Sequence, residues 1–253
     1  MRKNIDLVNG PVLKSLTQLA VPIMATSLIQ TAYNLTDMLW IGRVGSNAVA
    51  SVGVAGMYMW LSNGLAALPK MGGQVNVGHV LGAGRPKDAA NYATAALHIS
   101  IIFGLVFGLV CILFSNPLIG FFNLTGHQVI ADARIYLKIT CGCVIFSFLN
   151  QTLTGIFTAA GNSRSSFMAT LTGLLINMIL DPVLIFGLGP FPVMGVAGAA
   201  IATVLAQATV TLIFFCLCQK RQHYFCHIKL FRIPDRSLFL LLSESDSQLA
   251  YKI

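Results

Sequence analysis

The chain has 253 residues, of which 56% are hydrophobic and only 9% are charged, and its mean hydropathy is +0.77. About a quarter of the residues in a soluble domain are charged, so this composition excludes an ordinary water-facing surface. The formal net charge of +8 comes from short basic clusters between apolar runs. This layout is typical of membrane loops beside anionic lipid and disfavours nucleic acid as a partner.

Four long runs contain no Lys, Arg, Asp or Glu apart from Asp181, and they cover residues 15–36, 44–69, 89–131 and 165–219. A membrane span needs about 20 largely apolar residues, and an open strand would leave backbone groups unpaired in lipid. The two longest runs divide at Ser115-Asn116-Pro117 and at Gly189-Pro190-Phe191-Pro192. The predicted fold class is an all-α membrane protein. Its six transmembrane helices are expected near residues 12–41, 46–78, 88–115, 128–160, 164–188 and 194–218.

The loops between these spans predict the orientation and the domain organisation. Lys and Arg gather in the N-terminal segment, after the second and fourth spans, and in the tail, so both ends are expected in the cytoplasm. Arg134 and Lys138 near the outer end of the fourth span are expected to reach the lipid headgroups. We predict a multi-pass protein of the plasma (cytoplasmic) membrane, with a transmembrane lobe over 1–219 and a basic cytoplasmic linker and tail over 220–253.

No enzyme or cofactor motif is present in the sequence. It contains no nucleophile elbow, zinc-protease helix or phosphate-binding loop. The two Cys-x-Cys pairs, at 141–143 and 216–218, lie in spans without clustered His and are interpreted as small apolar filler. We therefore predict neither enzymatic activity nor a bound cofactor.

Two carboxylates inside the spans are the main functional candidates. An ionisable side chain at the bilayer centre costs about 2.5–3.5 kcal/mol on insertion scales and marks a functional site by default. Asp37 ends a one-faced stripe with Gln30 and Asn34, and Asp181 follows Asn177 by one turn. Pro182 leaves the carbonyl one turn before it without a donor. Such oxygens suit a proton or a small hard cation such as Na⁺.

Further polar stripes occur in the fourth and sixth predicted spans. Asn150, Thr154 and Thr158 share one face of the fourth, and Gln207 lies on a polar face of the sixth. These faces either line a wet cavity or form ordinary interhelical hydrogen bonds.

Two other positions in the spans leave alternatives open. Lys70 either pairs with a carboxylate or reaches the cytoplasmic interface. Pro22 is expected to bend the first span, as a hinge or as a tolerated curve.

Several segments in this order resemble the multidrug and toxic-compound extrusion (MATE) family, prokaryotic type. They are Ala20-Val21-Pro22-Ile23, Thr36–Gly45, Leu81–Ala89, Ala160–Ser163, Asn177–Pro182 and Gly195–Ala200. The resemblance covers roughly residues 10–220 and implies the N-terminal six-helix lobe of a two-lobed antiporter, in which multidrug efflux of cationic or amphipathic compounds is driven by Na⁺ or H⁺ as the coupling ion.

The resemblance also implies roles for individual residues. The cation-binding residues of prokaryotic relatives fall on Asp37, Asn177 and Asp181, with Thr154 at a neighbouring position, and the bend of the first span falls on Pro22. Ala199 stands where some relatives have a hydroxyl residue.

The chain resembles only the first lobe of this family, so its tail is interpreted as truncated or frame-shifted. The expected partners are membrane lipid, a small-molecule substrate, and a second six-helix lobe or another copy. Two alternative functions are a non-transporting membrane fragment or interaction subunit, and a lipid-linked saccharide flippase of related architecture. The flippase is disfavoured because Lys70 alone is basic near a span interior.

Overall fold

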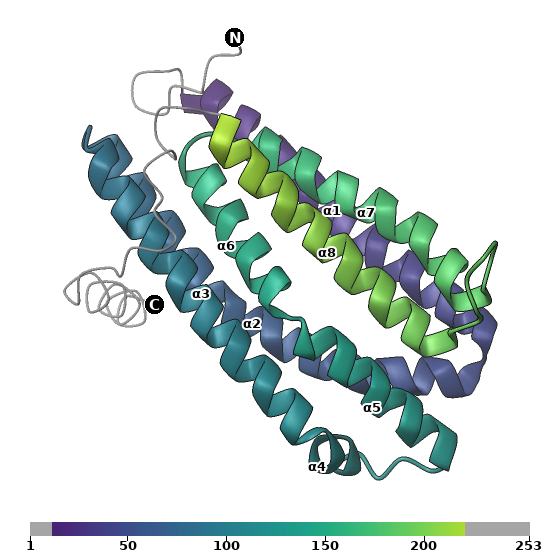
Figure 1. Cartoon of the computed structure of the whole chain (residues 1–253). Helices are drawn as coiled ribbons and strands as arrows, with labels where there is room; N and C mark the ends of the chain where they lie inside the picture. Colours follow the sequence, from purple (N-terminus) through teal and green to yellow (C-terminus); the bar gives the residue numbers. More distant parts are fainter. Residues whose placement is uncertain (1–11, 221–253) are drawn as a thin grey trace.

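The computed structural model describes residues 12–220, without some of the side chains in the first helix and those of the last two residues. This part of the chain is helical and contains no strand. The helices are α1 Val12–Val44, α2 Ser46–Gly82, α3 Pro86–Leu113, α4 Ser115–Gly120, α5 His127–Gly142, α6 Ile145–Ala159, α7 Ser163–Phe186 and α8 Gly195–Lys220 (Figure 1). Most of the predicted tail, 221–253, lies outside the described residues.

The helix boundaries differ from the expected spans mainly in the fourth. The predicted span 128–160 consists of α5 and α6, which follow one another end to end (Figure 1) and are separated at Cys143 and Val144. Beside this break, a Cβ on Gly108 of α3 would lie 3.0 Å from the carbonyl oxygen of Cys141 and 3.1 Å from that of Gly142. The α3 backbone thus approaches the broken segment closely, a contact that helical periodicity does not predict.

Three helices, α3, α7 and α8, are long and apolar enough to cross a membrane by length and composition. With 16 and 15 residues, α5 and α6 reach span length only together. Large apolar side chains point outward around the bundle, including Trp60, Phe121 and Leu28. An apolar exterior of this extent suits lipid rather than water.

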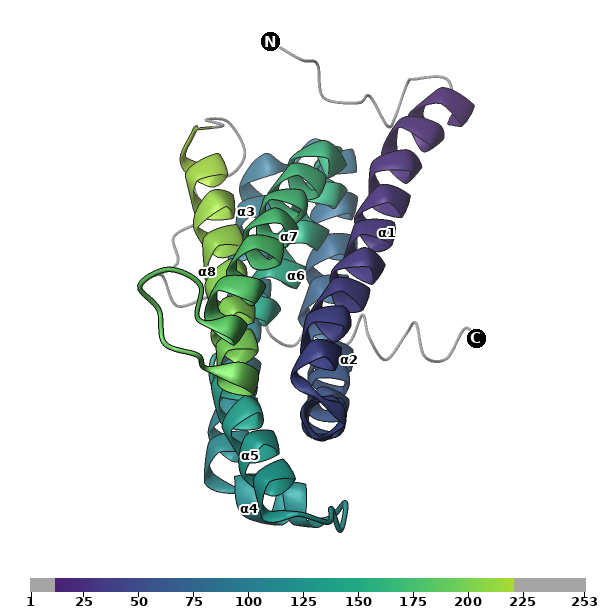
Figure 2. The same ribbon diagram turned by 90° about the vertical axis from the view of Figure 1, so that its right-hand side faces the viewer.

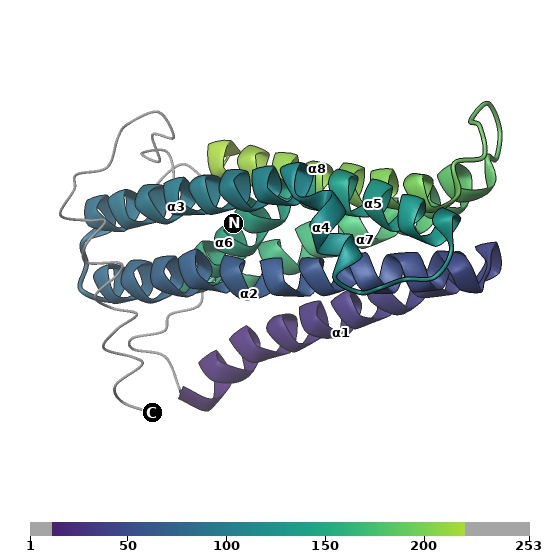
Figure 3. The same cartoon turned by 90° about the horizontal axis from the view of Figure 1, so that it is seen from below.

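The helices pack as a bundle in which small residues allow close contacts. α7 lies between α1 and α8 (Figure 2), α8 also contacts α5 and α6, and α2, α3 and α6 contact one another. α1 lies against α2 near their junction and diverges from it toward the N-terminal end (Figure 3). Consequently α1 takes its main support from α7, and this contact positions the candidate site.

Candidate cation site between α1 and α7

The α1–α7 contact buries three of the predicted site residues. Asp181 is fully buried, Asn177 is 1% exposed, and Asp37 is 9% exposed. Asn177 and Asp181 share a face of α7 because they are four residues apart, and the Asn177 amide donates a hydrogen bond of 3.2 Å to Oδ1 of Asp181. Pro182, inside α7, cannot donate to the carbonyl one turn earlier.

The Asp37 and Asp181 carboxyl groups lie close enough to interact electrostatically. Oδ1 of Asp37 and Oδ2 of Asp181 are buried and receive no hydrogen bond. Neither carboxylate forms an ion pair with Lys or Arg within residues 12–220. Two adjacent buried negative charges are unfavourable without a neutralising partner. Chemically, this pair fits a shared proton or a small cation held by hard oxygen ligands.

An aromatic pair, Trp40 and Phe186, borders this site and was not predicted from the sequence. Trp40 follows Asp37 by one turn and packs edge-on against Phe186 of α7, with ring centroids 6.1 Å apart. The Arg43 guanidinium lies 5.0 Å from the Trp40 ring centroid, in a cation–π contact. The three-residue spacing from Asp37 to Trp40 indicates that both lie on one face of α1. Contact with Phe186 required the tertiary structure.

The polar residues of α6 and α8 form a network of their own. The Asn150 amide donates to the backbone oxygen of Gln207 at 2.9 Å and to its side-chain oxygen at 2.7 Å. The Thr211 hydroxyl donates to the Asn150 side-chain oxygen at 2.8 Å. For these residues the structure shows an interhelical contact, with both groups of the Asn150 amide used.

The remaining predicted site residues stay apart from the carboxyl pair. Thr154 is half-buried and Thr158 is buried on α6, and no described contact joins either to Asp37 or Asp181. Gln30 and Asn34 share the stripe of Asp37 but are exposed. The Pro22 side chain is outside the described residues, so the bend stays a prediction.

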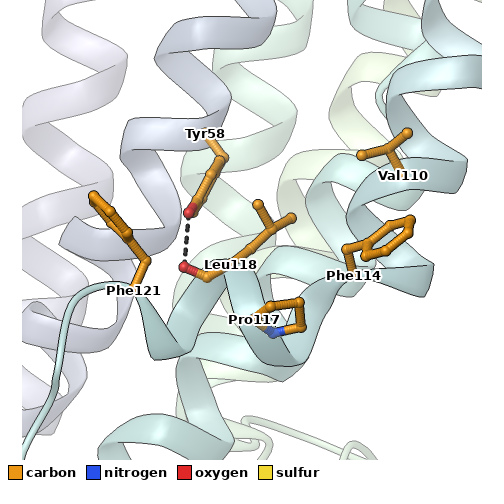
Figure 4. Close-up of a pocket in the computed structure, with 6 residues that line it drawn as sticks. All are labelled: Tyr58, Val110, Phe114, Pro117, Leu118 and Phe121. Carbon is orange, nitrogen blue, oxygen red and sulfur yellow. Dashed lines mark hydrogen bonds between the residues drawn. The ribbon is translucent and has the colours of Figure 1, made fainter.

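A separate apolar pocket of about 490 Å³ lies where α3 meets α4. Its lining residues are Tyr58, Val110, Phe114, Pro117, Leu118 and Phe121. The Tyr58 hydroxyl donates to the backbone oxygen of Leu118 at 2.7 Å (Figure 4). Because this bond occupies the pocket's hydroxyl and the rest of the lining is hydrocarbon, the pocket offers no ligand for a cation.

A family model described as MatE matches residues 22–183. The chain belongs to this family. MATE proteins are transporters, in agreement with the prediction that this chain is not an enzyme. The match includes Asp37, Asn177 and Asp181, and the structure is that of one six-helix MATE lobe, an all-α membrane protein.

Curated relatives and solved MATE structures agree with this assignment. A probable multidrug resistance protein NorM of Thermotoga maritima is 31% identical over 77% of this chain and 42% of its own length. An FAD transporter of Shewanella oneidensis is 27% identical over 81% of this chain and 45% of its own. The outward-facing structure of a multidrug resistance MATE transporter superposes with a TM-score of 0.85 at 26% identity, covering 96% of this chain and 53% of that one. A MATE crystal structure in the bent conformation gives 0.84 at 27%, covering 98% and 56%. The chain thus spans about half the length of these MATE relatives.

Proposed function

We propose that this chain forms one lobe of a cation-coupled MATE antiporter, in which Asp37 and Asp181 bind the coupling ion. The observation that carries the proposal is the pair of unpartnered carboxylate oxygens, one from α1 and one from α7, buried in the same contact. A monovalent ion bound there bridges the two carboxylates and offsets one of their two negative charges. Binding therefore favours the arrangement in which α1 and α7 are in contact.

The coupling ion is Na⁺ or H⁺. Burial in a low-dielectric interior favours uptake of a proton by a carboxylate, whereas several converging oxygens favour a bare hard cation. Asn177 is expected to hold Asp181 in place through its amide hydrogen bond. Coupling requires the ion to prefer one of two states of the α1–α7 contact, because a ligand with equal affinity for both states shifts nothing.

The transported compounds are proposed to be drugs or other cationic or amphipathic molecules, since relatives carry the names of multidrug exporters. A second six-helix lobe, in a longer chain or another copy, is proposed to complete the path. The lobe is placed in the plasma membrane with both ends cytoplasmic, following the distribution of Lys and Arg.

Exchange measured under one ion gradient at a time tests the proposal. The chain is reconstituted in liposomes together with the second lobe, as a longer chain or as another copy, and efflux of ethidium is followed with a Na⁺ gradient alone and with a pH gradient alone. Asp37→Asn and Asp181→Asn are each expected to abolish the gradient-dependent part. Asp132→Asn is the matched control, because that carboxylate lies on α5 and accepts a hydrogen bond from Gln128. Gradient-driven export that survives both Asn variants would contradict the coupling role.

A further inference from the structure

Lys70 of α2 is a charged residue that the proposed ion site does not use. At 1.5 Å per residue it lies about 10 Å from the middle of α2, which is less than half of a hydrocarbon core about 30 Å thick. It is half-buried and forms no ion pair within residues 12–220. A cationic side chain at this depth is costly and faces a wet or protein-lined space by default.

The stem of Lys70 crosses α6 at a glycine. A Cβ on Gly155 would lie 3.0 Å from the backbone oxygen of Lys70 and 3.1 Å from its Cγ, and 3.4 Å from Cβ of Gln74. A side chain at position 155 would therefore press on the Lys70 stem. The absence of one lets α2 and α6 approach at the level of the lysine.

Amide groups continue this seam along both helices. Gln151, one turn before Gly155 on α6, donates a hydrogen bond of 2.9 Å to the side-chain oxygen of Asn63 on α2. Asn63, Lys70 and Gln74 follow at spacings of seven and four residues and so share one face of α2. The Asn63–Gln151 pair is exposed, although it lies near the middle of α2, so the seam is open at Asn63 and packed against Gly155 at Lys70.

The charge of the seam is positive. Among the described acidic residues, Asp88 pairs with Arg85 at the start of α3 and Asp132 lies on α5. Asp37 and Asp181 are buried in the α1–α7 contact and belong to the proposed ion site. Lys70 is therefore a cation flanked by amides, a set of donors that suits a phosphate or carboxylate.

We propose that Lys70, with the amides of Asn63 and Gln151, forms a binding site for the anionic group of an amphipathic substrate. The inference rests on the proposed export function and narrows its substrate class to molecules that pair an apolar body with a phosphate or carboxylate. Lys70 selects the charge of the bound molecule.

A matched pair of fluorescent probes tests this selection. Riboflavin 5′-phosphate and riboflavin share one ring system and differ in the phosphate. Binding of each to the purified chain in lipid nanodiscs is measured by fluorescence at equilibrium, without an ion gradient. The phosphate form is expected to bind at least about tenfold more tightly, since it adds a charge-assisted hydrogen bond that riboflavin cannot form.

Variants locate the site. Lys70→Gln is expected to remove the preference for phosphate and leave riboflavin binding unchanged, Lys70→Arg to keep the preference, and Gly155→Ala to weaken it. Lys138→Gln is the control, because that lysine is exposed on α5. Thermal unfolding of each variant separates loss of the site from loss of the fold.

Several outcomes would overturn the inference. These are equal binding of the two flavins by the wild type, no binding of either, or an equal loss of both in Lys70→Gln. Displacement of the flavin phosphate by phosphatidylglycerol but not by inorganic phosphate would assign the site to a lipid headgroup instead. Intact phosphate selectivity together with export that ignores both ion gradients would contradict the proposed coupling and leave this site standing.

Discussion

At the level of single residues, the Asn150 network and the Asp37–Asp181 pair differ in whether their polar atoms have hydrogen-bond partners. Asn150 uses both its amide nitrogen and its oxygen in bonds to α8, so it is saturated. Asp37 and Asp181 each retain a buried oxygen without a partner. A fully hydrogen-bonded side chain stabilises the lobe, whereas a buried acidic pair that lacks hydrogen-bond partners can bind an ion. The two groups therefore predict opposite responses to substitution.

Ion binding at Asp37 and Asp181 predicts ion-dependent stability. A ligand that binds only the folded state at 100 times its Kd adds about 2.7 kcal/mol. If Na⁺ is the coupling ion, it is expected to raise the melting temperature of the wild type, but not that of Asp37→Asn or Asp181→Asn. The measurement is thermal unfolding in detergent with Na⁺ or choline, at fixed ionic strength. An equal Na⁺ response in all three proteins would argue against this site.

Loss of the Asn150 side chain predicts a structural defect. Asn150→Ala leaves the Gln207 oxygen and the Thr211 hydroxyl without this partner and is expected to cost about 1–2 kcal/mol of stability. Denaturant unfolding in detergent measures it, with Asn34→Ala as the control because Asn34 is exposed on α1. Ion-dependent stabilisation is expected to persist in Asn150→Ala. Equal stabilities of the two variants would show that the α6–α8 network contributes nothing.

At the level of helices, close packing at glycine holds α7 against α8. A Cβ on Gly198 would lie 2.5 Å from the carbonyl oxygen of Leu184, and one on Gly173 would overlap Cγ2 of Val210. A valine methyl can rotate away, but a backbone carbonyl cannot. The contact between Gly198 and Leu184 therefore tolerates a side chain less well than the contact between Gly173 and Val210. Leu184 lies one turn after Asp181 on α7.

This difference predicts a graded effect of alanine. Gly198→Ala is expected to cost about 1–3 kcal/mol, as overpacking does, and Gly173→Ala less. Gly53→Ala is the control, since nothing lies within 4 Å of a Cβ there, and it is expected to be neutral or stabilising because alanine favours the helix. Thermal unfolding of the three variants orders them. Equal melting temperatures for Gly198→Ala and Gly53→Ala would exclude the close contact.

At the level of the whole lobe, α1 exposes side chains of two kinds, apolar side chains and amides. Met24 and Leu28 are 70% and 72% exposed, while Gln30 and Asn34 are exposed on the same helix. Apolar side chains can face lipid, but exposed amides at membrane depth need water or a protein partner. Since the MATE relatives are about twice as long as the match, we expect the amide face to border the path between two lobes.

Water access tests this assignment. In a background without native cysteines, Asn34→Cys is expected to react with a charged, membrane-impermeant thiol reagent in liposomes permeabilised to the reagent. Leu109→Cys is the control, because Leu109 is 57% exposed on the apolar helix α3 and is expected to stay unmodified in lipid. Equal modification of the two cysteines would remove the distinction between a lipid face and a wet face.

The sequence by itself determined the helical membrane class, the break at 189–192 and the two acidic candidates; the break expected at 115–117 falls at Phe114, and residues 115–117 begin α4. These features depend on chain-local physics: the length of an uncharged run, the backbone's need for hydrogen bonds, and the cost of a charge in lipid. Periodicity also placed Asn177 and Asp181 on one face of a helix, because that relation lies within a single element.

The tertiary structure alone decided which faces meet. It joined Asp37 to Asp181 across α1 and α7, paired Asn150 with Gln207, and left Gln30 and Asn34 uncovered. A stripe of polar residues defines one face of its own helix but does not show which other helix packs against that face. That neighbour is chosen by small residues such as Gly198 and Gly155, whose missing side chains decide how closely, and therefore which, helices pack.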